Sequence, residues 1–111
     1  MADLKLDDRV RAALEAARAE LNARFDIDRI VLFGSVARGE ADEESDVDLL
    51  VVLKDRPDHQ LENRISSMIL DINLEHDTNL SALVVDRDAW DRGMISAMPI
   101  HDEVEGDGVL L

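Results

Sequence analysis

The sequence contains no cysteine, and its 111 residues include only two prolines and three aromatic side chains. A chain without cysteine has no disulfide framework, no thiolate metal ligand and no thiol nucleophile, and it suits a reducing compartment. No segment approaches the roughly 18 consecutive apolar residues of a membrane span, and the N-terminal residues lack the basic and apolar segments of a signal peptide. We therefore expect a cytosolic protein that does not associate with membranes.

Basic residues are also scarce, since 12 lysines and arginines face 26 acidic residues and the formal net charge is −14. Such a field repels a phosphate backbone, so we expect no direct binding to nucleic acid. The same field attracts divalent cations and favours a basic protein partner. The alternative is that most of these charges only keep the protein soluble.

Length and composition favour one folded domain over residues 1–111. Hydrophobic residues make up 46% of the chain and charged residues 34%, a composition typical of a packed core and unlike that of a disordered chain.

The apolar pattern predicts a helix over residues 6–24, followed by a buried strand over 27–33 that stops at a Gly-Ser pair. A second apolar run, residues 47–53, is short and rich in β-branched side chains and predicts another strand. Residues 34–45, between these two strands, include two glycines and four acidic residues, a composition that disfavours a long helix or strand. We therefore expect a loop there that can contain a short helix.

The second half of the sequence predicts a helix from Pro57 to about Glu75 and a strand over residues 80–85. Asp86 and Asp88 supply carboxylates for the start of a further helix, which runs through Trp90 and Met94 and is ended by Pro99. A short strand follows at residues 109–111. This order predicts an α+β fold, a small mixed β-sheet with helices packed mainly on one face.

The first residues that indicate a chemical function are two carboxylates. Asp46 and Asp48 lie two positions apart at the start of a predicted strand, so both side chains leave the same face with Cα atoms about 6–7 Å apart. Because neighbouring negative charges raise each other's pKa, we expect this pair to bind a cation. Hard oxygen ligands suit Mg²⁺, which one or two carboxylates, water and substrate phosphates commonly hold.

Phosphate-binding groups precede this pair. Gly34 and Ser35 follow the first strand, where a backbone without a Cβ can approach a ligand and a hydroxyl can donate to phosphate oxygens. Arg38 can bind the same anion, and Gly39 then turns the chain. The combination is that of phosphoryl or nucleotidyl transfer. Each part has an alternative: the Gly-Ser pair as an ordinary turn, and Arg38 as an ion-pair partner of one of the nearby acids Glu40, Asp42, Glu43 and Glu44.

The segment GSVARGEADEESDVDLLVVL resembles the G-S-x-A-R-G … S-D-x-D-L-x-V signature of the polymerase β-like nucleotidyltransferase superfamily, and specifically its minimal, MNT-type members. The resemblance implies that fold, with nucleotide phosphates bound by Gly34 and Ser35 and Mg²⁺ held by the catalytic residues Asp46 and Asp48. It also implies transfer of a nucleoside monophosphate from a triphosphate such as ATP. Members of this type are commonly antitoxins of HEPN-type ribonuclease toxins, and some of them adenylylate the toxin.

One position departs from the family pattern, which places a third carboxylate on the next strand. Matching the run LVV to that pattern puts Ala82 at the acidic position, and we expect Ala82 to face the carboxylate pair. Asp77 and Asp86 flank the strand. Of these two acids, Asp77 is the candidate substitute for the third carboxylate. Without a general base, acceptor activation typically loses about 10²- to 10⁴-fold in rate, so a partner or Asp77 would have to complete the site.

Three functions follow from these observations. The first is Mg²⁺-dependent transfer of AMP from ATP to a protein, with a HEPN-type toxin as the partner. The second is a catalytically weakened, nucleotide-binding antitoxin that neutralises its partner by binding. The third, modification of a small molecule such as an aminoglycoside, is disfavoured because the chain is short.

A stripe of Trp90, Met94 and Met98 is expected in the core, with a partner surface as its alternative, and self-association is left open.

Overall fold

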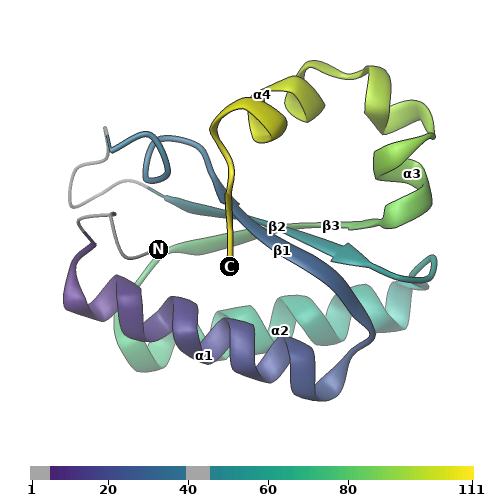
Figure 1. Ribbon diagram of the computed structural model, residues 1–111. Coiled ribbons are helices and arrows are strands. Elements are labelled where there is room, and N and C mark those ends of the chain that lie inside the picture. The colour runs from purple at the N-terminus through teal and green to yellow at the C-terminus, as the bar shows by residue number, and fades with distance from the viewer. Residues whose placement is uncertain (1–5, 40–45) are drawn as a thin grey trace.

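The computed structural model describes residues 6–39 and 46–111 (Figure 1). Along the chain the elements are α1 (Asp8–Arg24), β1 (Ile27–Phe33), β2 (Val47–Leu53), α2 (His59–His76), β3 (Leu80–Asp86), α3 (Arg87–Asp91), the 3₁₀ helix η1 (Met94–Ala97), α4 (Pro99–Asp107) and β4 (Val109–Leu110). The predicted strands and the two long helices are confirmed, and most of their predicted ends agree to within two residues. Residues 40–45 of the predicted loop lie outside the described residues, while residues 35–39 form turns.

The four strands form one mixed sheet in the order β3-β2-β1-β4. β1 is antiparallel to both β2 and β4, whereas β2 and β3 are parallel. Because α2 crosses between β2 and β3, the N-terminal ends of these two strands lie side by side. The end of β1 reaches the same place, since Phe33 pairs with Asp48. Three chain segments therefore meet at one end of the sheet.

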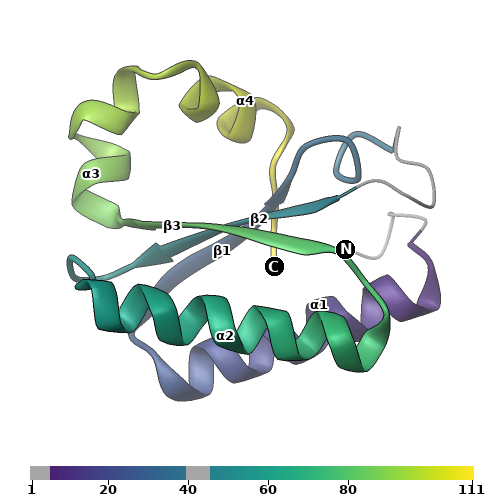
Figure 2. The same cartoon turned by 180° about the vertical axis from the view of Figure 1, so that it is seen from behind.

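Helices cover both faces of this sheet to different extents. The long helices α1 and α2 lie side by side on one face, and the short segment from α3 to α4 arches over the other (Figures 1 and 2). Two apolar clusters correspond to the two faces. The larger one joins α1 and α2 to alternate residues of the strands, and the smaller one surrounds the buried Trp90. The α+β mixed sheet is thus confirmed, with its two long helices on one face.

Local signals explain where the long helices begin and end. The side chains of Asp7 and Asp58 accept hydrogen bonds from the backbone N–H groups of Arg9 (2.8 Å) and Leu61 (2.8 Å) and so cap α1 and α2. The predicted start of α2 at Pro57 is therefore one residue before its cap. Asp77 ends α2 in the left-handed conformation, with φ +53°.

The helix predicted to begin at Asp86 and to end at Pro99 is correct at its start, where Asp86 caps α3, but its extent is wrong. The chain breaks there into α3 and η1, and Pro99 begins α4 instead of ending the preceding helix. Proline is well suited to the first position of a helix because the N–H it lacks would be unpaired there. A Cβ at Gly93 would lie 2.7 Å from the Cα atom of Ala89, so the chain can fold back at that point only without a side chain.

The break in the helix also separates the predicted apolar stripe. Trp90 lies in the core, as expected, but Met94 and Met98 are exposed. Within the described ranges, no helix is both long enough and apolar enough to cross a bilayer.

Candidate functional site

The two carboxylates at the start of β2 share one face of the sheet. Val47, which lies between them in the sequence, is buried in the larger apolar cluster on the α1–α2 side, so Asp46 and Asp48 point to the opposite face. Burial raises the pKa of Asp48, and the charges of Asp46 and Glu103 raise it further. The site therefore concentrates negative charge that the protein itself compensates poorly.

Gly34 lies against this pair at the end of β1. Its φ of +79° falls in the left-handed region, and a Cβ built on it would collide with the Oδ2 atom of Asp48. Both the backbone conformation and the contact with Asp48 require glycine here. The carboxylate is thus packed directly against the peptide backbone that precedes Ser35.

Arg38 returns to the site through the turn that follows. Its backbone N–H donates to the carbonyl of Gly34 at 3.2 Å, and Gly39 reverses the chain with φ +74°. The Nη1 atom of Arg38 lies 3.5 Å from the Oε1 atom of Glu103, and the positive charge of Arg38 lowers the pKa of Asp48. The predicted residues Gly34, Ser35, Arg38, Asp46 and Asp48 therefore belong to one local arrangement.

Two residues of this arrangement were missed in the sequence. Asn79, just before β3, donates from Nδ2 to the Oδ1 atom of Asp46 at 2.9 Å, and its carbonyl accepts from the N–H of Val47 at 3.0 Å. Glu103 reaches the site from α4. The parallel pairing of β2 and β3 brings Asn79 close, and the arch of α4 brings Glu103, so neither contact has a signal in local spacing.

The expectation that Ala82 faces the carboxylates is wrong. Ala82 packs against the larger apolar cluster on the α1–α2 side, whereas Ser81, its neighbour, is exposed and is the registry partner of Asp48. Side chains of registered residues in a parallel pair leave the same face. The position on β3 that faces the carboxylate pair is therefore Ser81, which has a hydroxyl and no acid.

The flanking acids have other partners. Asp86 lies at the far end of β3, and its side chain caps α3 by accepting from the N–H of Ala89 at 3.0 Å. Asp77 holds Arg9 of α1 through a 2.9 Å ion pair. Both carboxylates are thus held by other partners, and the β3 residue in register with Asp48 is Ser81.

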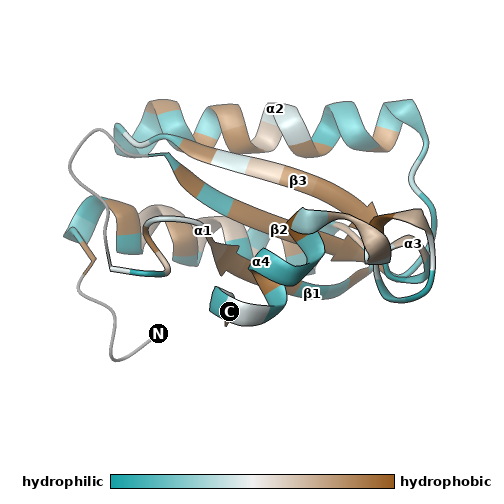
Figure 3. Ribbon diagram, turned by 90° about the horizontal axis from the view of Figure 1, so that it is seen from above, coloured by the Kyte–Doolittle hydropathy of each residue, from teal (hydrophilic) through white to brown (hydrophobic). Residues whose placement is uncertain are grey.

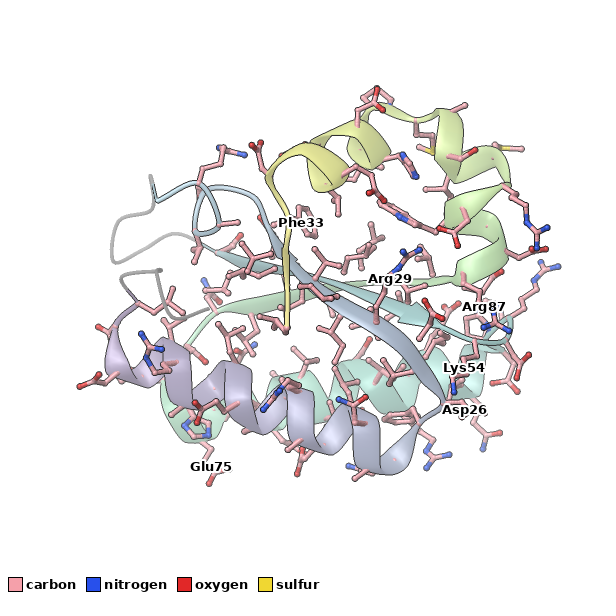
Figure 4. The ribbon with its side chains drawn as sticks, viewed as in Figure 1. Asp26, Arg29, Phe33, Lys54, Glu75 and Arg87 are labelled. Carbon is pink, nitrogen blue, oxygen red and sulfur yellow. The ribbon has the colours of Figure 1, made fainter. Side chains whose placement is uncertain are left out.

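A second group of charged residues gathers at the opposite end of the sheet. A shallow cleft there is lined by Lys54, Arg56, Arg87 and Arg92 together with neighbouring acids. Figure 4 shows Lys54 and Arg87 at that end and Phe33, the last residue of β1, beneath α4. Arg92 pairs with Asp88 at 2.9 Å, so part of this charge is neutralised within the cleft. The cleft is separate from the carboxylate pair.

The chemistry of the donor set fits a magnesium ion that shares its coordination with a substrate. Among the described residues, no group of three or more His, Cys, Asp or Glu side chains is placed to hold a metal. Two carboxylates are nevertheless as many ligands as a protein usually supplies to Mg²⁺, and substrate phosphates and water supply the rest. One of the two, Asp48, has a raised pKa.

Comparison with known proteins agrees with this geometry. The family profile described as "Nucleotidyltransferase domain" matches residues 14–94, from α1 to η1. The chain belongs to the nucleotidyltransferase domain family. The matched region contains every site residue named above except Glu103, which lies on α4 beyond residue 94.

Two relatives show how far the similarity extends. A Methanocaldococcus jannaschii protein named as a protein adenylyltransferase is 40% identical over 58 residues, which is 52% of this chain and 59% of that protein. The protein adenylyltransferase MntA of Thermococcus cleftensis is 46% identical over 57 residues, 51% of this chain and 57% of that protein. The matches thus span less than two thirds of the length of these relatives.

Solved structures extend the likeness over nearly the whole chain. A structure described as a minimal nucleotidyltransferase is 29% identical, with a TM-score of 0.63 and coverage of 92% of each chain. A chain of a toxin–antitoxin crystal structure with AMP-PNP is 19% identical, with a TM-score of 0.54 and coverage of 93% of this chain and 69% of that one. The second likeness is one of fold.

The raised pKa of Asp48 predicts that the site is unfavourable for stability when no metal is bound. A carboxylate whose pKa rises on folding destabilises the folded state once pH exceeds the ordinary value of 3.8, and the full penalty applies above the raised pKa. We expect Asp48→Asn to stabilise the metal-free protein near neutral pH by about 1 kcal/mol, the size usual for relieving an unfavourable charge. The measurement is thermal unfolding in the presence of a chelator.

The control variant is Asp71→Asn, which removes an exposed charge from α2 and changes the net charge equally. The gain of Asp48→Asn should shrink as pH falls towards about 4, where the wild-type carboxyl becomes protonated in both states. Equal midpoints for Asp48→Asn and wild type at neutral pH would show that the site is not strained by its charges.

Proposed function

We propose that this protein transfers AMP from ATP to a protein acceptor, as the antitoxin of a toxin–antitoxin pair. The observation that carries the proposal is the packing of Gly34 against Asp48, which supports a role for this turn in binding phosphate beside carboxylates that hold a metal. Nucleotidyl transfer needs those two elements together, since positioning and charge stabilisation supply most of its catalysis.

Each residue has a role in this proposal. The backbone at Gly34, the Ser35 hydroxyl and the Arg38 guanidinium bind the phosphates of ATP, and Asp46 and Asp48 hold Mg²⁺. When bound, Mg²⁺ supplies positive charge against the charge that develops on the reacting phosphate. Asn79 fixes the orientation of Asp46 through its 2.9 Å hydrogen bond.

Glu103 keeps Arg38 near the phosphate position before ATP binds. The 3.5 Å pair between these side chains is partly exposed, and exposed pairs of this kind contribute little to stability. A triphosphate carries more negative charge than one carboxylate and accepts bidentate hydrogen bonds from a guanidinium. Arg38 can therefore exchange Glu103 for phosphate without a large loss of stability.

A HEPN-type toxin is the proposed partner. The net charge of −14 favours a basic protein, the named relatives are protein adenylyltransferases, and a solved neighbour is part of a toxin–antitoxin complex.

A second candidate function is neutralisation by binding alone. The observation in its favour is Ser81, which faces the carboxylates from β3 without supplying an acid. An antitoxin of this kind would bind ATP and its partner but transfer AMP slowly.

Labelled transfer separates the two candidates. The protein is incubated with Mg²⁺, ATP labelled at the α-phosphate and a purified HEPN-type toxin. Label that moves onto the partner, together with loss of toxicity that requires ATP, supports the adenylyltransferase. Neutralisation without ATP and without label supports the binding antitoxin, and failure of both sinks the proposal.

Phosphate recognition can be tested without a partner. Ser35→Ala removes one hydrogen bond to a charged group, so we expect a loss of about 1.5–3 kcal/mol in Mg-ATP binding, and Arg38→Ala should cost a similar amount. Calorimetric titration of ATP and of adenosine gives the measurement. If the wild type bound both ligands equally, the protein would not be reading the triphosphate at all.

A further inference from the structure

The helix α4 holds a carboxylate beside the candidate site. Figure 3 shows this helix lying over the sheet. Val104 is buried in the smaller apolar cluster together with Phe33, the last residue of β1. Glu105 accepts a hydrogen bond from the indole N–H of Trp90 at 3.1 Å. These two contacts hold the helix directly after Glu103, so the carboxylate of Glu103 can move only as far as its own side chain reaches.

Glu103 faces both kinds of group that a nucleotide would meet in the site. Its Oε1 atom lies 3.5 Å from the Nη1 atom of Arg38, the proposed phosphate ligand. Its negative charge also reaches Asp48, because it is one of the causes that raise the pKa of that carboxyl. The side chains of Arg38 and Glu103 are 34% and 45% exposed, so a dissolved anion can reach this pair. Glu103 therefore takes a place on Arg38 that a phosphate oxygen would take.

Exchange of Glu103 for a phosphate leaves a negative charge in the site. Because α4 is held in place, rotation of the Glu103 side chain cannot carry its charge far beyond the screening length, about 8 Å at physiological salt. The charge therefore acts on a bound triphosphate even after the pair with Arg38 has opened. Mg²⁺ cancels part of the charge of the triphosphate, so this repulsion is stronger for ATP that carries no metal.

We propose that Glu103 selects for nucleotide that carries its metal, by competing with the triphosphate for Arg38 and by repelling a triphosphate whose charge is not neutralised. This inference rests on the proposed function and adds a specificity-determining residue to the same site. Metal-free ATP would meet the charges of Asp46, Asp48 and Glu103 together, whereas Mg-ATP brings the cation that the first two carboxylates need. Exclusion of metal-free ATP keeps the site available for the nucleotide that can react.

Equilibrium dialysis of the full chain with labelled ATP, in Mg²⁺ or in EDTA, tests the proposal without an acceptor protein. Glu103→Gln removes the charge and keeps the size of the side chain. We expect this variant to bind ATP about tenfold more tightly in EDTA but only about threefold more tightly in Mg²⁺, because the cation removes about half of the charge that Glu103 repels. The preference for the metal complex, the ratio of the two dissociation constants, therefore falls.

Two further variants separate this effect from a general change in charge. Asp102→Asn is the matched control, since it removes one exposed acid from the same helix, and it should leave the preference for the metal complex unchanged. Arg38→Ala removes the group for which Glu103 competes. In that background Glu103→Gln should tighten ATP binding less than it does in the wild type, a coupling that a purely structural role of Glu103 would not produce.

The inference and the proposed function can fail separately. Unchanged or weaker binding of ATP by Glu103→Gln in EDTA overturns the inference and leaves Glu103 only the role of holding Arg38 in place. Equal tightening in EDTA and in Mg²⁺, or an equal effect of Asp102→Asn, also overturns it and indicates a general effect of net charge. Each of these results leaves AMP transfer intact, whereas a wild type that binds no ATP in Mg²⁺ overturns the inference and the proposed function together.

Discussion

Asp46→Asn and Asp48→Asn should each lower the rate of AMP transfer by about 10²- to 10³-fold, the size typical when one group that stabilises transition-state charge is removed. Each change deletes one of the two carboxylates that the described residues offer to a cation at the start of β2. We also expect Mg-ATP binding to weaken at least about tenfold, because relief of the repulsion between the two acids cannot replace a lost ligand. Single-turnover transfer of labelled AMP and calorimetric titration give the two values.

The fold should survive both changes, so the loss can be assigned to the site. Asp48→Asn should even melt at a higher temperature than the wild type when metal is absent, and this opposite response of stability and activity is expected of a residue kept for function. Asp71→Asn, at an exposed position on α2, provides the control for net charge. If both site variants kept wild-type Mg-ATP affinity, the assignment of the metal ligands would be wrong.

The strands could be predicted because each is a short run of apolar residues with clear ends. β2 matches residues 47–53 as predicted, since the acids before it and the charged residues after it limit the run. The carboxylate pair was also visible, because alternation within one strand fixes which side chains share a face. Local patterns of this kind do not depend on the rest of the fold.

The C-terminal third of the chain depends on tertiary contacts that local patterns do not contain. Gly93 lets the chain fold back against Ala89, and Pro99 serves equally well as the end of one helix or the first residue of the next. Glu103 reaches Arg38 across 65 positions of sequence. These features become visible only when α4 has been placed over the sheet.

The prediction that Ala82 faces the carboxylates from β3 failed for a different reason. Matching the run LVV to a family pattern put Ala82 at the acidic position, but a shift of one residue along a strand moves a side chain to the other face. The burial of Leu80 and the packing of Ala82 and Val84 on the α1–α2 side, with Ser81 exposed, fix the face that each residue occupies. The alternation of the strand was a better guide than the motif.

This orientation leads to the last prediction, which concerns the acid that β3 lacks. Ser81→Asp should raise the rate of AMP transfer by about 10²-fold or more, because a carboxylate there can take the proton of the acceptor hydroxyl, a step that typically contributes about 10²- to 10⁴-fold. The registry of Ser81 with Asp48 places the new group on the correct face. Time courses of labelled AMP on the partner protein give the rate.

Two control variants separate this effect from a general change in charge or structure. The asparagine side chain in Ser81→Asn has nearly the same shape as aspartate but cannot act as a base, so this variant should give no gain in the rate of transfer. Ala82→Asp introduces a charge on the packed α1–α2 side and should lower the melting temperature without accelerating transfer, since an unpaired charge is costly there. A wild-type rate that already reaches about 1 s⁻¹ and is lost in Asp77→Asn would instead give the third role to Asp77. In that case the ion pair with Arg9 would have to open during turnover.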